Sequence, residues 1–263
     1  MTSDTFIDPL PLWAVLLGTI LLGLLVGELG FRLGRFWQRS THSNKEGSVG
    51  AMAAATLGML AFLLAFVTSM AATRFDNRRA LVVEEANAIG TTFLRAGFLN
   101  QPLRGEARTL LAEYVDIRLA AAQDSSLLSQ TLARSEQIQI ALWLQVEQMH
   151  SADMAASGVD LYIEALNGMI DTHTKRSVAV TSSRLPGELW LGIYGVAMLT
   201  MLLVGLQNSF GECRNWVSLV VLVTVFALVL TLIVDLDRPT QGLLTVSQQA
   251  MMDLQALIKG VMP

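Results

Sequence analysis

Residues 49–72 read VGAMAAATLGMLAFLLAFVTSMAA and contain no charged side chain. A bilayer core about 30 Å thick needs roughly 20 apolar residues in a helix, so this stretch is long enough to span a membrane. A second long stretch, 10–31, has Glu28 as its only charge, and two shorter stretches, 189–206 and 216–234, have none. The four stretches together predict a membrane protein with four spans.

The composition agrees with a membrane protein and excludes several other classes. The chain has 263 residues, of which 52% are apolar and 15% charged, whereas soluble domains carry about 25% charged residues. Its net charge of −4 excludes a broadly basic nucleic-acid binder, so we expect no nucleic-acid partner. The single cysteine, Cys213, cannot form an intramolecular disulfide. No Lys or Arg precedes the first span, unlike in a signal peptide, so we expect this span to remain as an anchor.

Positive charges near the span ends bear on the orientation of the chain. Four of them follow the first span, whereas the segment before it has none, and this local count places the N-terminus outside. A count over all span ends gives the opposite result, with seven positive residues on the N-terminal side against five. Following the local count, we expect the N-terminus outside.

The region between the second and third spans, 73–184, is polar and helical in pattern. No proline interrupts the chain from the second span to Gln101, so we expect that helix to continue beyond the membrane until Pro102 breaks it. Further helices are predicted over 103–123, from the turn at 124–126 to about 156, and from 159 toward 182, with a break at Gly158. The predicted fold class is therefore all-α. It comprises a transmembrane hairpin (1–72), an extramembrane helical bundle (73–185), a second transmembrane hairpin (186–238) and a C-terminal tail (239–263).

Small residues recur along one face of each of the first two spans. They are Gly23, Gly27, Gly30 and Gly34 in the first span, and Gly50, Ala54, Gly58, Ala61, Ala65 and Ser69 in the second. Such faces let helix backbones approach closely in lipid, where no hydrophobic force drives association. Because adjacent helices usually pair, we expect the two faces to pack within one subunit. An interface between subunits is the alternative.

Another flank of the second span carries Phe62 and Phe66, together with Met59 and Met70. In a channel, such a stripe can form a hydrophobic constriction that gates by dewetting. Apolar stripes are also ordinary in membrane-spanning helices, where they face lipid or fill the bundle. Phe62 and Phe66 are therefore candidates for the pore, with lipid contact or packing as the alternative.

One acidic residue, Glu28, lies inside a span. An intramembrane acid is a candidate for a proton or ion pathway. Arg32 follows four residues later, where the two side chains can pair on one helix face. We expect this structural pair and keep the ion pathway as the alternative.

The densest group of charges follows the second span. Its members are Arg74, Asp76, Arg78, Arg79, Glu84 and Glu85, and the fourth span ends on the same side with Asp235, Asp237 and Arg238. Arginine suits bidentate pairing with carboxylates, so we predict an interfacial salt network that locks the two hairpins together. The functional alternatives are an anion vestibule lined by Arg74, Arg78 and Arg79 and a cation site on the two aspartates.

Three blocks of residues resemble a known family. The first contains Arg74-Phe75-Asp76, Arg78-Arg79, Leu81-Val82 and Glu85-Ala86-Asn87-Ala88-Ile89-Gly90-Thr91. The second contains Ala165-Leu166-Asn167, Ile170-Asp171, His173, Lys175-Arg176, Arg184 and Pro186. The third contains Asp235-Leu236-Asp237-Arg238-Pro239, Gly242, Val246-Ser247-Gln248-Gln249 and Asp253-Leu254. Together they resemble the bestrophin-like family of bacterial membrane proteins.

The family name points to bestrophins, which are pentameric anion channels with four spans and a helical region between the second and third. The resemblance therefore implies a homo-oligomer, a pentamer by analogy, in the bacterial inner membrane, with lipid and anions as partners. It also implies cytoplasmic termini, contrary to the local charge count. Bestrophins bind calcium through an acidic cluster after the fourth span. Only Asp235 and Asp237 occupy a comparable place here, so we expect no metal site and no cofactor.

Enzyme motifs are absent from the sequence. It contains no H-E-x-x-H, no G-x-S-x-G and no P-loop, and Cys213 has no neighbouring histidine to activate it. His173 is expected on a solvated helix face, with pH sensing as its alternative role. We therefore predict no enzymatic activity and no catalytic residue.

Two functions fit these features. The first is a homo-oligomeric channel, anion-conducting, with the second span lining the pore and Arg74, Arg78 and Arg79 at one mouth. The alternative is a membrane-anchored interaction or sensor protein without transport activity, which meets a partner through region 73–184. A ring-shaped oligomer with a continuous axial path favours the first function, and a dimer without such a path favours the second.

Overall fold

The computed structural model describes residues 10–40, 46–151, 158–181, 184–211, 215–238 and 242–262. Every regular element in these ranges is a helix, which confirms the predicted all-α class. The chain forms two compact units. We call Met1–Arg74 with Arg184–Leu244 the membrane unit, and Phe75–Ser183 with Thr245–Pro263 the bundle unit.

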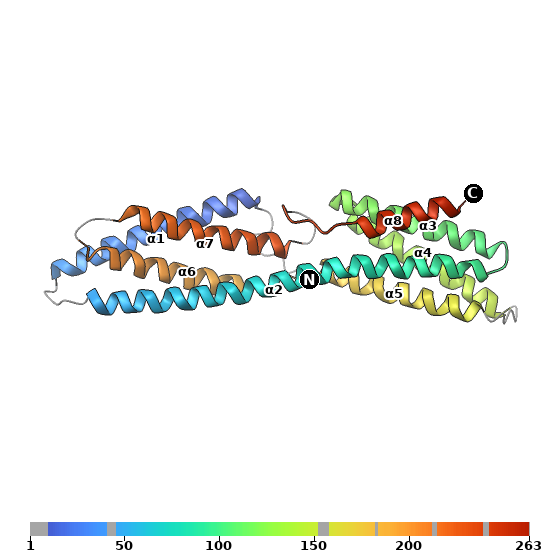
Figure 1. Cartoon of the computed structure of the whole chain (residues 1–263), viewed down its shortest axis with the longest axis horizontal. Helices are drawn as coiled ribbons and strands as arrows, with labels where there is room; N and C mark the ends of the chain where they lie inside the picture. The colour runs from blue at the N-terminus through green and yellow to red at the C-terminus, as the bar shows by residue number, and fades with distance from the viewer. Residues whose placement is uncertain are drawn as a thin grey trace. The chain divides into compact units, whose positions relative to one another are not determined.

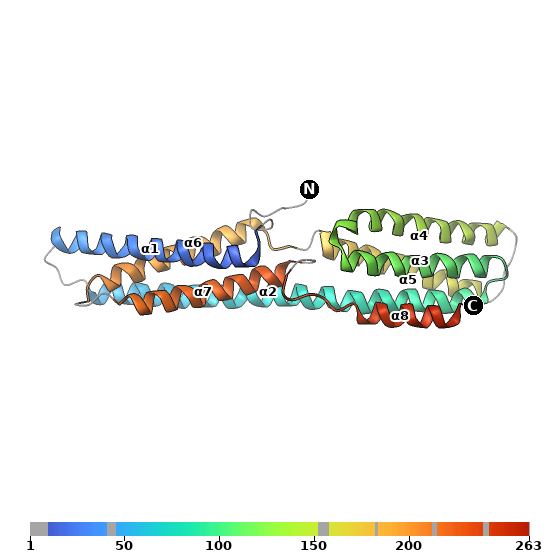
Figure 2. The ribbon, with the colours of Figure 1, turned by 90° about the horizontal axis from the view of Figure 1, so that it is seen from above.

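The membrane unit contains the four apolar helices. These are α1 (Leu12–Ser40), the first part of α2 (Glu46–Arg95), α6 (Gly187–Asn208) and α7 (Trp216–Asp237). Each is long and apolar enough to cross a bilayer, which confirms the four predicted spans. Figures 1 and 2 show α1 lying beside α6 and α7. The side chain of Asn215 caps α7 by accepting the N–H of Ser218 at 3.2 Å.

The core of the membrane unit forms around one stripe of α2. Leu60, Leu64, Val67 and Ala71 recur every three or four residues, so they share one helix face, and all four are buried. Their partners in the core are Val15, Leu185, Trp190, Ile193, Ala197, Leu230, Ile233 and Val234. This stripe fixes which face of α2 is turned toward the rest of its own unit.

The glycine face of α1 packs on α6 and α7. A Cβ atom added to Gly30 would lie 2.1 Å from the carbonyl oxygen of Leu202 in α6, and one on Gly205 would lie 1.9 Å from that of Gly27. Gly23 faces Val223 of α7. The expectation that this face pairs with the second span is wrong. The reason is that Gly27 and Gly30 meet the backbone of α6, at a contact where only glycine leaves room.

The bundle unit contains the remaining helices. They are the second part of α2, α3 (Leu103–Gln123), α4 (Leu128–Ser151), α5 (Val159–Thr181) and α8 (Gln249–Val261), with short 3-10 turns at Ala96–Phe98 and Ser125–Leu127. Helix α2 continues beyond the apolar stretch, as predicted, but it ends at Arg95, before the break expected at Pro102. Asp124 accepts the N–H of Ser126 at 2.9 Å and so makes the predicted turn before α4. The expected end of that helix near 156 lies outside the described residues.

Helix α8 lies within the segment that the sequence marks only as a tail. Its residues Met251, Leu254 and Ile258 recur at helical spacing and are buried in the core of the bundle unit. Core residues from the other helices include Ile89, Phe93, Leu111, Tyr114, Ile138, Leu142, Tyr162, Leu166 and Met169. The C-terminal helix is therefore part of the bundle. The four-part division drawn from the sequence stays a proposal.

Candidate functional site

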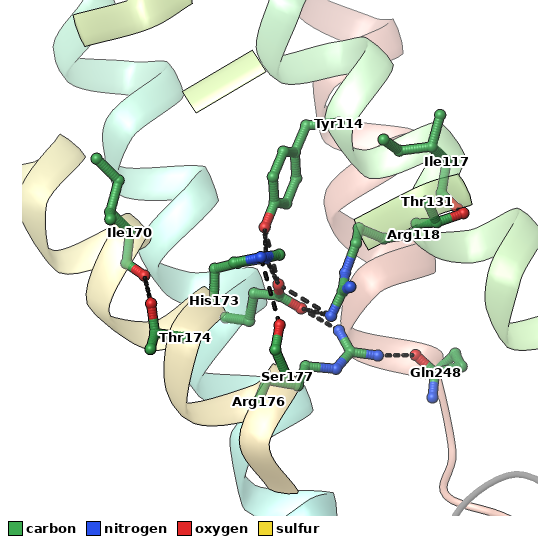
Figure 3. A network of polar contacts seen from close by, with 11 residues as sticks. Tyr114, Ile117, Arg118, Thr131, Ile170, His173, Thr174, Arg176, Ser177 and Gln248 are labelled. Atoms are coloured by element: carbon green, nitrogen blue, oxygen red, sulfur yellow. Dashed lines mark hydrogen bonds and ion pairs between the residues drawn. The ribbon is translucent and has the colours of Figure 1, made fainter. Parts of the chain in front are cut away.

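A group of charged and polar side chains meets inside the bundle unit (Figure 3). Its members are Glu85 from α2, Tyr114 and Arg118 from α3, and His173 and Arg176 from α5, and each is at most 8% exposed. We call these five residues the buried charge cluster. Helical spacing explains their convergence, because Tyr114 and Arg118 are four residues apart on α3, and His173 and Arg176 three apart on α5.

The carboxylate of Glu85 lies at the centre of the buried charge cluster. Arg176 donates from Nη1 to Glu85 Oε2. Arg118 Nη2 lies 3.2 Å from Oε1 and 3.3 Å from Oε2 of the same carboxylate. The hydroxyl of Tyr114 donates to Oε1 at 3.1 Å. The buried carboxylate thus has two guanidinium partners and one hydroxyl partner, as a buried charge requires.

Hydrogen-bond directions in the cluster assign the tautomer of His173. An ionised carboxylate only accepts, so the Tyr114 proton points to Glu85. His173 Nδ1 lies 2.7 Å from the Tyr114 oxygen and must therefore donate to it. The other ring nitrogen, Nε2, accepts from the hydroxyl of Ser177 at 3.3 Å. A directed chain of hydrogen bonds runs from Ser177 through His173 and Tyr114 to Glu85.

Burial and neighbouring charges shift the pKa values in the cluster. Burial opposes ionisation of Glu85, but Arg176 and Arg118 outweigh it and hold its pKa below the ordinary value. Burial lowers the pKa of His173, and Arg118 adds to this effect, against the pull of Glu85 and Glu136. Burial and the nearby Glu85 charge raise the pKa of Tyr114. At neutral pH the cluster therefore holds one carboxylate, two guanidinium groups and a neutral histidine.

The expectation that His173 lies on a solvated helix face is wrong. His173 belongs to the buried face of α5, on which Tyr162, Leu166, Met169 and Arg176 also lie. These residues recur every three or four positions, and this spacing is the signal in the sequence that could have placed His173 inside. The cluster also reaches α8, since Arg176 Nη2 donates at 3.2 Å to Oε1 of Gln248, directly before that helix.

The charged residues that follow the second span differ in how far they are exposed. Arg78 is buried, whereas Asp76 and Arg79 are exposed and Arg74 is half-buried. Glu84 is exposed and pairs with Lys175 of α5 at 3.2 Å. The sequence grouped Glu85 with these residues, and the structure gives it partners on α3 and α5.

The charges at the end of α7 bind backbone groups of the membrane unit. Asp235 accepts the N–H groups of Leu243 and Leu244 at 2.8 and 3.1 Å. Both carboxylate oxygens of Asp237 accept the N–H of Leu185, at 3.0 and 3.2 Å. Arg238 donates to the carbonyl oxygen of Leu10. The salt network predicted between the two hairpins stays a prediction.

Glu28 and Arg32 form the pair that their spacing predicts. The distance between Glu28 Oε1 and Arg32 Nε is 2.8 Å.

Among the residues that the structure describes, no three His, Cys, Asp or Glu side chains gather closely enough to hold a metal ion.

A second candidate surface is the exposed face of α2 in the membrane unit. Phe62 is 70% exposed and Phe66 57%, and Met59 beside them is exposed as well. The small residues Ala54, Gly58, Ala61, Ala65 and Ser69 are exposed too. The expectation that these small residues pack within one subunit is therefore wrong, because the packing stripe of α2 is the opposite one. Phe62 and Phe66 do not fill the core of this unit.

Comparisons with known proteins agree with this architecture. A family model described as the Bestrophin-like domain matches residues 11–251. Among functionally curated proteins, none matches the chain. A variant of a bacterial bestrophin homologue from Klebsiella pneumoniae is similar in structure, with a TM-score of 0.67 at 14% identity over 95% of this chain and 98% of that chain.

A second structure of the Klebsiella pneumoniae homologue has a TM-score of 0.65 at 15% identity, over 96% of this chain and 100% of that chain. At these identities the likeness shows a shared fold. The family match spans almost the whole sequence and confirms the resemblance drawn from the three residue blocks. The chain therefore belongs to the bestrophin-like family.

Proposed function

We propose that this protein is a subunit of a homo-oligomeric ion channel in which α2 lines the pore. The exposed face of α2 carries this proposal. Leu60, Leu64 and Val67 bury one stripe of the helix in its own unit, while Phe62 and Phe66 stay uncovered on another. A pore-lining helix needs such an arrangement, because the pore forms only when copies assemble. Bestrophins, whose fold and family this chain shares, are ion channels.

The small residues beside the phenylalanines support assembly from identical copies. Ala54, Gly58, Ala61 and Ala65 are exposed at helical spacing, and such faces allow close helix approach in lipid. Copies related by a rotation axis along the membrane normal would turn the same stripe of α2 toward one axis. We propose a pentamer, by analogy with bestrophins, in the bacterial inner membrane.

Phe62 and Phe66 would form the narrow hydrophobic section of this pore. They are four residues apart and so lie one turn apart on one face. Rings of apolar side chains in a pore can expel water and block ions until they separate. In this proposal the two phenylalanines are the gate.

Selectivity for anions is proposed from the charges that follow the gate. The stretch after the span holds three arginines, Arg74, Arg78 and Arg79, against one aspartate, Asp76. Arg79 and Asp76 are exposed and can contact passing ions. Arg78 is buried, so its charge acts on ions only through long-range electrostatic attraction. The excess of positive charge favours anions at this mouth.

Chloride flux into liposomes that contain the purified protein tests the channel proposal. Phe62→Ala and Phe66→Ala should each raise the flux several-fold, because they widen the constriction. Leu191→Ala is the control, since Leu191 is an exposed apolar residue of α6; it should leave the flux unchanged. No flux from folded protein, across a range of pH and calcium, would refute the channel. The alternative, a membrane-anchored interaction or sensor protein without transport activity, would then be the favoured function.

The ratio of chloride to potassium permeability tests the anion mouth separately. Arg79→Gln should lower this ratio, and Asp76→Asn, three residues away, should raise it, because the two changes shift the local charge in opposite directions. If both variants keep the wild-type ratio, ion selectivity does not come from this turn of α2.

A further inference from the structure

The last turns of α1 present a basic and aromatic surface. Arg32, Arg35, Phe36 and Arg39 are exposed, and Phe36 is 71% exposed. Steps of three and four residues place the three arginines on one side of the helix, within about 60° of each other at 100° per residue. Phe36 projects next to Arg32 on the same side. We call these four residues the α1 basic face.

The opposite side of α1 is the one that packs. Gly34 is buried, and a Cβ atom on it would lie 2.1 Å from Oγ of Ser209. Gln38 Nε2 donates to the carbonyl oxygen of Ser209 at 3.0 Å. Because these residues fix the rotation of α1, the α1 basic face is turned away from the membrane unit.

The register between α1 and α7 gives the depth of this face in the membrane. Gly27 packs against Leu219, which lies three residues after the start of α7 at Trp216. The two helices run in opposite directions, so α7 begins level with about Gly30. Trp216 is exposed, and exposed tryptophans at span ends lie at the headgroup level. The arginines that follow Gly30 therefore lie at the headgroup level and just beyond it.

The charge of the α1 basic face is not balanced along the helix. Between Glu28 and Glu46 the sequence has no acidic residue, and Glu28 pairs with Arg32, the first of the three arginines. Arg35 lies over the ring of Phe31, with 5.5 Å between the guanidinium carbon and the ring centroid. This contact holds the side chain of Arg35 beside the helix and leaves its donors available to an anion.

We propose that the α1 basic face binds the headgroups of anionic phospholipids. Guanidinium groups bind phosphate in bidentate geometry, and basic residues at a membrane surface gain about 1 kcal/mol each from anionic lipid. The exposed side chains of Leu33 and Phe36 add apolar surface at the level of the arginines, which the lipid interface can cover. A soluble anion would leave this apolar surface uncovered. The proposal is independent of ion conduction.

Native mass spectrometry of the full chain in detergent tests this proposal. The protein is mixed with equal amounts of phosphatidylglycerol and phosphatidylcholine, and the ratio of bound lipids is measured. Wild-type protein should retain phosphatidylglycerol several-fold over phosphatidylcholine. The triple variant Arg32→Gln, Arg35→Gln and Arg39→Gln should retain the two lipids about equally.

A matched control removes the same charge from the bundle unit. It carries Arg134→Gln, Lys175→Gln and Lys259→Gln, all at exposed positions, and should keep the wild-type ratio. An unchanged ratio in the α1 triple variant, or an equal loss in the control, overturns the proposal. If the triple variant does not fold, Arg35→Gln and Arg39→Gln are measured singly. Each should lower the ratio, and no change in either one also overturns the proposal.

Discussion

Glu85 is the common partner of the two arginines and the tyrosine in the buried charge cluster. Its carboxylate is fully buried between Arg118 and Arg176. A buried ion pair is weak evidence of net stability, because both partners lose their hydration. Removing one partner is different, since the remaining charges then lie uncompensated in a medium of low dielectric constant. The cluster therefore makes the bundle sensitive to single substitutions.

Glu85→Gln should lower the free energy of unfolding by about 3–5 kcal/mol, because it leaves two buried guanidinium groups without a carboxylate. Thermal and denaturant unfolding of the detergent-solubilised protein would measure this loss. Glu84→Gln is the matched control on the neighbouring residue. Its partner Lys175 is exposed, so the loss should be at most about 1 kcal/mol. Equal losses in the two variants would contradict the role assigned to Glu85.

The stability of the bundle should fall as the pH falls. The pKa of His173 is lowered in the folded state, so the unfolded chain binds its proton first, and stability is lost as pH drops below the ordinary value of 6.5. The pKa of Glu85 is also lowered, so its contribution is lost at lower pH, below the ordinary value of 4.5. Both shifts act in the same direction.

Unfolding temperature measured between pH 8 and pH 5 isolates the histidine. Wild-type protein should lose stability as the pH falls through about 6.5. His173→Asn keeps an amide donor near the position of Nδ1, so it can still reach Tyr114, and it removes this titration. Its unfolding temperature should change much less over the same range. A variant that follows the wild-type curve would show that another group is responsible.

At the scale of helices, α1 and α6 approach each other closely enough to bring backbone against backbone. The atoms nearest to a Cβ on Gly30 or Gly205 belong to the backbone of the facing helix. Backbone cannot move aside as a side chain can, so the helices would have to separate. A single methyl group added at this contact should therefore disturb the packing.

Gly205→Ala should lower the unfolding temperature clearly, because overpacking of a tight contact costs about 1–3 kcal/mol. Gly18→Ala on α1 is the control, since nothing lies within 4 Å of a Cβ there. Alanine also has a higher helix propensity than glycine, so this control should not lose stability. If both variants melt at the same temperature, the contact between α1 and α6 is looser than described.

Periodicity in the sequence predicted the helices, but it did not predict which helices pack against one another. The four spans, the continuation of α2 and the turn at Asp124 follow from residues close together in sequence. Spacing also showed that Gly23, Gly27 and Gly30 share a face, but it carries no information on which helix covers that face. Our assumption that sequential neighbours pair was the error.

The buried charge cluster could not be predicted for a related reason. Glu85 and Arg176 are 91 residues apart, and their meeting depends on how α2 and α5 pack. A charged residue on an otherwise apolar stripe is the local sign of a buried pair. Glu85 lies on such a stripe with Val82, Ala86 and Ile89. This local pattern identifies Glu85 as a buried charge, but it does not identify the residue that pairs with it.

At the scale of the whole molecule, four spans place the N-terminus and the loop at Ser126 on the same side of the membrane. Ser126 is exposed and suits labelling. In a Cys213→Ser background, Ser3→Cys and Ser126→Cys should both react with an impermeant thiol reagent added to intact cells, if the local charge count gives the orientation. Protection of both would reverse the orientation and agree with cytoplasmic termini, as in bestrophins. Labelling of only one would contradict four spans.

Helix α2 serves two cores in one uninterrupted helix, because it contributes to both units. Leu64, Val67 and Ala71 are buried in the first unit, and Val82 and Glu85 are buried in the second. One residue inserted within either buried stripe would rotate the later residues of that stripe by about 100° relative to its earlier ones, so the two parts could no longer face the same core. Each stripe can therefore change its residues over evolution far more freely than its spacing.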